Sequence, residues 1–113
     1  MTASILSGKL GEDLAAAYLS EKGYIILSRN YRYKKSEIDI IAIYNNTLIF
    51  IEVKFRKNNT FGNPEAFVTA KKESMILMGA ENYIFENKWK GKIRFDIVSL
   101  TSKENLVHFE DAF

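Results

Sequence analysis

Two carboxylates and a lysine in the middle of the chain are the residues best suited to chemistry. Glu52 and Lys54 come near the end of the apolar run 48–55, where apolar and charged side chains begin to alternate as in a β-strand. The two-residue period of a strand places Glu52 and Lys54 on one face. Asp39 lies thirteen residues before Glu52, at the start of a second apolar run. Charged groups beside apolar strand residues are costly to bury, so their presence suggests that they pair with each other or form a site.

The spacing predicts that Asp39 and Glu52 lie close together. Asn45-Asn46, between them, is a hairpin-turn signal, and counting outward from it brings Asp39 opposite Glu52 to within about two residues. Paired carboxylates suit Mg²⁺, which also keeps waters and takes substrate phosphate as a ligand. The metal would polarise a phosphoryl oxygen and acidify a bound water, and Lys54 would orient that water or stabilise developing charge. The pattern therefore indicates phosphodiester hydrolysis.

The alternative is an ordinary pair of opposite charges at a solvated strand end, which is common in β-sheets. The presence of Asp39 and the fully apolar run before Glu52 favour the site over this alternative. Glu12, near the start of the first expected helix, either complements the helix dipole or adds a ligand to the metal.

Two further titratable residues are expected to have structural roles. Asp96 lies between apolar residues of an expected strand, where it caps a loop or pairs with Arg94 or a lysine. His108, the single histidine, is expected to be a packed or surface side chain rather than a ligand or base.

The elements that must position these residues follow the order α-β-β-β-α-β-β. Helices are expected over 10–22, ended by Gly23, and over 70–85, capped by Thr69. Strands are expected over 24–28, 37–44, 47–56, 93–100 and 106–109, and a polar, basic loop over 30–36. Because a helix connects the third and fourth strands, part of the sheet should be parallel. The expected fold is α/β, a mixed sheet flanked by helices in a single domain over residues 1–113.

Composition narrows the class of protein further. The 113 residues include no cysteine, which excludes disulfides, thiolate metal sites and cysteine nucleophiles. No stretch is long and apolar enough to span a bilayer, and the N-terminus lacks a signal-peptide layout, so we expect a cytoplasmic protein with no membrane partner. The net charge is only +2, and the basic residues gather in clusters. The distribution of charge is therefore more informative than its sum.

Five segments of the chain together resemble a known family. They are residues 11–12 (GE), 29–32 (RNYR), 37–42 (EIDIIA), 50–56 (FIEVKFR) and 94–96 (RFD). The family is the small bacterial YraN-like family, a branch of the PD-(D/E)xK or restriction-endonuclease-like superfamily, and archaeal Holliday-junction resolvases are its relatives. The resemblance covers nearly the whole chain. It departs from the superfamily's name in one place, since Ile38 rather than proline precedes Asp39.

The resemblance implies a restriction-endonuclease-like mixed sheet and a metal site made by Asp39 and Glu52. Lys54 belongs to the same site, and Glu12 matches an acidic residue that resolvase-like members carry on their first helix. The implied activity is that of an endonuclease dependent on Mg²⁺ or Mn²⁺. Its expected substrate is DNA rather than RNA, in branched or distorted structures, and a homodimer would let two sites address two strands.

A nuclease of this kind needs basic side chains along the phosphate backbone. The residues expected in that role are Arg29, Arg32, Lys34, Lys35, Arg56 and Lys72. Tyr31 and Tyr33 are available to stack on unpaired bases. The alternative for the basic segment 29–35 is a solvated surface turn.

A different class of function stays open at this stage. The same fold and basic surface would suit a non-catalytic nucleic-acid-binding module that tethers nucleic acid or recruits a repair or replication partner. The intact Asp39, Glu52 and Lys54 argue against it, because a binding module does not require all three. A third alternative is a protein-interaction domain with incidental charges. It predicts no affinity for nucleic acid at moderate salt, whereas the first two predict affinity that falls as salt rises.

Overall fold

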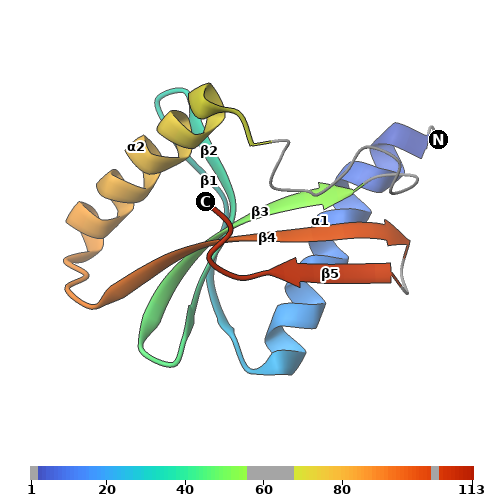
Figure 1. Ribbon diagram of the computed structural model, residues 1–113, viewed down its shortest axis with the longest axis horizontal. Helices are drawn as coiled ribbons and strands as arrows, with labels where there is room; N and C mark the ends of the chain where they lie inside the picture. Colours follow the sequence, from blue (N-terminus) through green and yellow to red (C-terminus); the bar gives the residue numbers. More distant parts are fainter. Residues whose placement is uncertain (1–2, 56–67, 103–104) are drawn as a thin grey trace.

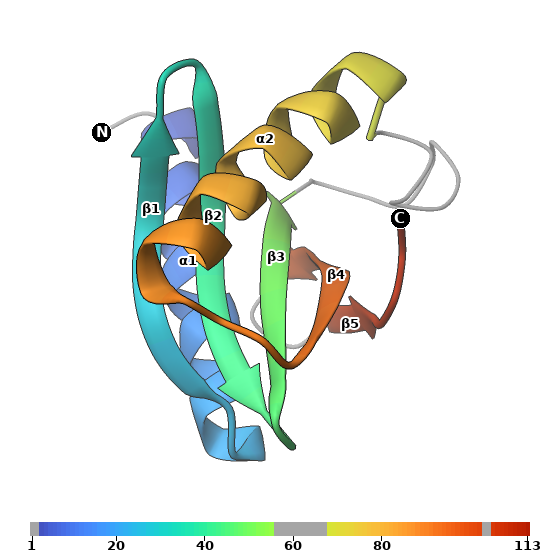
Figure 2. The same cartoon turned by 90° about the vertical axis from the view of Figure 1, so that its left-hand side faces the viewer.

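A five-stranded sheet with one helix on each face forms the fold (Figures 1 and 2). The computed structural model describes residues 3–55, 68–102 and 105–113. The elements are α1 Ala3–Lys22, β1 Ile25–Tyr33, β2 Ser36–Tyr44, β3 Thr47–Phe55, α2 Ala70–Asn87, β4 Lys92–Ser102 and β5 Asn105–Phe109. The predicted class and the predicted order of elements are confirmed. Neither helix of the described segments has the length and apolarity needed to cross a membrane.

The strands lie in the order β1-β2-β3-β4-β5, so the strand that carries Glu52 and Lys54 is central. Neighbouring strands are antiparallel except for β3 and β4, which run parallel and are joined through α2. Two parallel neighbours need such a crossover because a short turn reverses the chain. The predicted parallel pairing is therefore confirmed.

The side chains of β3 divide between two cores. Ile49 and Ile51 pack on the side of α1, whereas Leu48 and Phe50 pack on the side of α2. Because successive residues of a strand alternate between faces, Glu52 continues the α2 face beyond Phe50. Glu52 and Lys54 thus lie on the α2 face of β3, just beyond the apolar residues that pack against α2.

The prediction of a polar loop over 30–36 is wrong. Strand β1 continues to Tyr33 and pairs with β2, from Tyr31 opposite Ile38 to Tyr33 opposite Ser36. The chain turns between these strands at Lys34, whose φ of 55° is left-handed. An edge strand with one solvated face can carry as many polar side chains as a loop. For this reason the composition of residues 30–33 did not distinguish a strand from a loop.

Helix α1 begins at Ala3, earlier than the predicted residue 10. Serine and glycine in its first turns weaken the helix propensity there. Gly11 lies directly on β3, since a Cβ at this position would be 2.9 Å from atoms of the Phe55 side chain. The close approach brings the middle of α1, including Glu12, to the same end of the sheet as Phe55 and Glu52.

Helix α2 is fixed over the hairpin of β1 and β2. Thr69 is its N-cap as predicted, and the Thr69 side chain accepts a hydrogen bond from the backbone N–H of Lys72 at 3.1 Å. Farther along, Gly79 lies against the buried Ser36, whose Oγ would overlap any Cβ placed there. This contact holds α2 close to the hairpin. The first turns of α2 lie near the start of β2 and the end of β3, where Lys72 contacts Glu52.

Candidate active site

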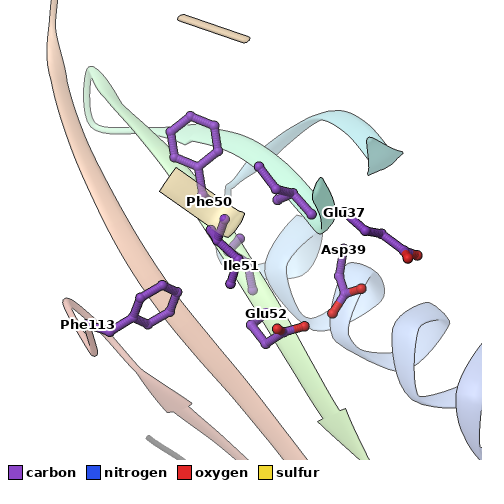
Figure 3. Close-up of a pocket in the computed structure, with 8 residues that line it drawn as sticks. Glu37, Asp39, Phe50, Ile51, Glu52 and Phe113 are labelled. Carbon is purple, nitrogen blue, oxygen red and sulfur yellow. The ribbon is translucent and has the colours of Figure 1, made fainter. Parts of the chain in front are cut away.

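Asp39 and Glu52 lie on neighbouring strands as predicted. The pairing of β2 with β3 runs to Ile40 opposite Ile51, and Asp39 and Glu52 are the next residues outward. There the backbone N–H of Val53 donates to Oδ2 of Asp39 at 2.8 Å, which fixes the carboxyl group against the sheet. Figure 3 shows the carboxyl groups of Asp39 and Glu52 turned toward each other, while Glu37 points away from them.

Lys72 reaches this carboxyl pair from the first turns of α2. Its Nζ lies 2.8 Å from Oε2 of Glu52, whose side chain is only 7% exposed. Lys54, two residues after Glu52 on β3, lies beside Lys72 and is half-buried. The structure places Lys72 in direct contact with Glu52, and its expected contact with nucleic-acid phosphates stays a prediction. Two carboxyl groups and two ammonium groups therefore form one cluster.

The two carboxyl groups of the cluster differ in how readily they ionise. Burial raises the pKa of Asp39 to about 8, and its hydrogen bond to Glu52 and the charge of Glu52 add to the effect. Burial also opposes ionisation of Glu52. Its hydrogen bonds with protonated Asp39 and with Lys72 outweigh burial, so the pKa of Glu52 is lowered. At neutral pH Asp39 is thus the proton donor and Glu52 the carboxylate.

The lysines of the cluster are affected in opposite directions. Burial is the main cause that lowers the pKa of Lys54, and the neighbouring Lys72 charge lowers it further. For Lys72, burial acts against the charge, but the hydrogen bond to Glu52 and the charge of Glu52 prevail and raise its pKa. A partly buried lysine that gives up its proton more readily than usual is a feature of reactive sites.

The carboxyl pair opens into a cavity of about 320 Å³. Its other walls come from Lys35 and Glu37 of the hairpin and from Met75 and Ile76 of α2. Two carboxyl groups beside an open cavity fit Mg²⁺ or Mn²⁺, which need hard oxygen ligands and room for waters and a phosphate. Asp39 would have to lose its proton before both carboxyl groups could act as metal ligands.

Glu12 is not brought into this cluster. Its Oε1 accepts hydrogen bonds from Nε of Arg29 at 2.8 Å and from Nδ2 of Asn30 at 3.0 Å. Asp13 binds the same guanidinium at 2.6 Å. Among the described residues, no three acidic or histidine side chains are grouped as a metal site. Glu12 is therefore not placed as a third metal ligand. The Arg29 guanidinium binds the carboxylates of Glu12 and Asp13, and its expected contact with a phosphate stays a prediction.

The remaining basic residues are placed differently. Lys34 and Lys35 are exposed at the tip of the β1–β2 hairpin. Arg32, on the same hairpin, lies 3.6 Å from the Glu37 carboxylate. Arg56 falls outside the described residues. Contact of these residues with nucleic acid stays a prediction.

A second charged cluster is buried on the α1 face, around the fully buried Asp96. Its carboxylate receives two hydrogen bonds of 2.8 Å from Arg94, one of 3.0 Å from the backbone N–H of Asp111, and lies 2.7 Å from Nε2 of His108. The pairing with Arg94 and the capping of a loop are confirmed. The contact with His108 was not predicted, because only the pairing of β5 with β4 brings that side chain here.

Two properties set the Asp96 cluster apart from the Asp39–Glu52 cluster. Burial opposes ionisation of Asp96, but hydrogen bonds from Arg94 and His108 outweigh it and lower the pKa. The cluster also extends to Tyr18, whose hydroxyl lies 3.1 Å from Nδ1 of His108. An acid with so many partners has no free oxygen to offer a ligand, so this cluster is structural.

The fold and the site define a small mixed α/β domain with a carboxylate–lysine site at the ends of its central strands. The family model described as "Uncharacterised protein family UPF0102" matches residues 11–100, and the chain belongs to this family. The YraN-like resemblance is thus confirmed at the level of the family. The matched region contains Asp39, Glu52, Lys54 and Lys72.

Curated relatives support the same membership across most of the chain. A UPF0102 protein of Cytophaga hutchinsonii is 50% identical over 107 residues, which cover 95% of each chain. One of Phocaeicola vulgatus is 47% identical over 109 residues, which cover 94% of this chain and 90% of the relative. One of Persephonella marina is 41% identical over 111 residues, with 97% and 95% covered. The similarity therefore includes both helices and the sheet.

Proposed function

We propose that this protein is a metal-dependent endonuclease of the PD-(D/E)xK type that hydrolyses phosphodiester bonds in DNA. The observation that carries the proposal is the contact of Asp39 and Glu52 at the ends of adjacent strands, with Lys54 and Lys72 beside them. The cluster opens into a cavity instead of being saturated by protein partners. A purely structural cluster would more closely resemble the one around Asp96.

Asp39 and Glu52 are the residues that would hold Mg²⁺ or Mn²⁺, which when bound supplies a Lewis acid for a phosphoryl oxygen and makes a bound water more acidic. Lys54 is half-buried on the same face, where it is suited to orient the attacking water or to stabilise negative charge. Lys72 is near enough to bind a phosphate next to Glu52. The protein thus contributes ligands, a positioned ammonium and a basic wall.

Cleavage of a labelled panel tests this proposal. The panel contains duplex, single-stranded, flapped and four-way-junction DNA together with RNA, each with Mg²⁺ or Mn²⁺. Wild type is expected to cleave at least one DNA, and Lys54→Ala to lose roughly 100-fold or more of the rate, since it removes a charge-stabilising group. Lys71→Ala, an exposed lysine on α2, is the matched control and should retain activity. Salt-sensitive binding without cleavage would instead favour the non-catalytic module.

Binding of Mg²⁺ is expected to strengthen as the pH rises toward 8. The metal needs Asp39 ionised, and its pKa of about 8 keeps it mostly protonated at neutral pH. Below that pH, each unit should weaken the apparent affinity by about tenfold, because the proton competes with the metal. Isothermal titration calorimetry over a pH series, in buffers of different ionisation enthalpy, measures both the affinity and the proton released. A pH-independent affinity without proton release would contradict Asp39 as a ligand.

A further inference from the structure

A second cavity lies along the same side of α2. It has a volume of about 230 Å³ and is lined by Tyr33, Met78, Glu81 and Asn82. Met78 is one helical turn beyond Met75, which lines the cavity at the carboxyl pair. On the facing hairpin, Tyr33 lines the second cavity and Lys35 the first. The two spaces therefore follow each other along the seam between α2 and the β1–β2 hairpin, whose course is visible in Figure 2.

Only one of the two hairpin tyrosines is free to contact a ligand in this seam. The Tyr31 hydroxyl donates to Glu86 at 2.9 Å and receives the amide of Asn82 at 2.7 Å. Its ring packs edge-on against Tyr83, with centroids 5.3 Å apart, so Tyr31 is partly buried against the core. Tyr33 instead lines the cavity, with the Lys34 ammonium 5.3 Å from its ring centroid. That cation adds positive charge beside an aromatic surface.

The chemistry of this second cavity suits one planar, partly polar ring. Its volume is below the range of pockets for drug-sized ligands, and it offers an aromatic ring, a thioether and polar groups from Glu81 and Asn82. Lys35 lines the cavity at the carboxyl pair and the Lys34 ammonium lies over the Tyr33 ring, so both would meet a phosphate backbone that follows the seam. A base inside a duplex has both faces covered by stacking, so only an unpaired base can offer one to Tyr33.

We propose that this seam accepts one unpaired nucleotide, with its base against Tyr33 and its neighbouring phosphate at Asp39 and Glu52. The substrate is then DNA with single-stranded character at the cut, such as a flap, fork or gap, rather than a continuous duplex. The inference rests on the proposed function, and it adds a specificity determinant to that function.

The test compares affinity for a flapped DNA and for a continuous duplex of the same sequence, measured by fluorescence anisotropy in EDTA. Wild type should prefer the flap, and Tyr33→Ala should lower that preference by roughly tenfold through loss of base stacking. Tyr33→Phe should retain the preference, because stacking needs the ring and not the hydroxyl. Phe85→Ala removes an aromatic ring that is 82% exposed near the end of α2, and it should change neither affinity.

A second readout locates the contact. A 2-aminopurine placed at successive positions of the flap should lose fluorescence on binding at one position beside the cut in wild type and Tyr33→Phe, and at none in Tyr33→Ala. An equal loss of affinity for flap and duplex in Tyr33→Ala, or no loss at all, would overturn the inference and leave the nuclease proposal standing. Absence of nucleic-acid binding by wild type would overturn both.

Discussion

Asp39→Asn is expected to abolish cleavage of nucleic acid and at the same time to make the folded protein more stable above neutral pH. Loss of activity follows from removing one of two carboxylates proposed to hold the metal, and it should amount to roughly 1,000-fold or more. The gain in stability follows from the environment of Asp39, which favours the neutral side chain.

The direction of the stability change can be derived from the pKa of Asp39. Its folded value, about 8, exceeds its ordinary value of 3.8, so protonation stabilises the folded state. This contribution is complete below about pH 4 and is lost as the pH rises through 8. Asparagine is permanently neutral: its oxygen can still accept the N–H of Val53, and its amide can still donate to Glu52. At about pH 8 the variant should therefore be more stable by roughly 1–3 kcal/mol.

Urea denaturation at about pH 5 and pH 8, together with cleavage assays, measures both effects. The gain in the free energy of unfolding should be larger at the higher pH. Glu37→Gln is the matched control, because Glu37 lines the same cavity while pointing away from the carboxyl pair (Figure 3). It should change activity and stability little. A destabilised Asp39→Asn protein at pH 8 would show that the folded state favours ionised Asp39 and that the pKa of Asp39 is not raised.

Asp96→Asn is expected to have the largest effect on folding, a loss of about 3–5 kcal/mol. The substitution leaves Arg94, which is about one-fifth exposed, without the carboxylate that binds it through two hydrogen bonds. It also weakens the anchor for the backbone N–H of Asp111 and for His108. Breaking one side of a buried ion pair is costly because the other charge stays behind.

Chemical denaturation followed by circular dichroism measures this loss. Asp13→Asn is a suitable control, because Asp13 also binds an arginine but does so on the surface, with its side chain 45% exposed. Exposed ion pairs contribute little to stability, so the control should unfold much like wild type. Similar stabilities for the two variants would mean that the Asp96 cluster is not a structural anchor.

The contact of Asp39 with Glu52 could be predicted because it depends on local chain geometry alone. A two-residue turn fixes the register of a hairpin, and the count from Asn45-Asn46 leads to the observed neighbours. Thr69 was predictable for a similar reason, since a helix cap acts within one turn. Both predictions use interactions between residues that are close in sequence.

Contacts between distant elements could not be predicted in this way. The ion pair of Lys72 with Glu52 depends on how α2 crosses the sheet, which in turn depends on Gly79 fitting over Ser36. The engagement of Glu12 by Arg29 likewise needs the packing of α1 on β1. Sequence alone shows which residues carry charge, whereas tertiary packing decides which charges neutralise each other.

The ion pair of Lys72 with Glu52 and the raised pKa of Asp39 reduce the repulsion between the two carboxyl groups without a bound cation. Many small metal-binding domains are unfolded without their metal, because the free energy of metal binding supplies the free energy of folding. Under the proposed function, folding and metal binding would therefore be separate events. Removal of metal with EDTA would then abolish cleavage and leave the free energy of unfolding unchanged.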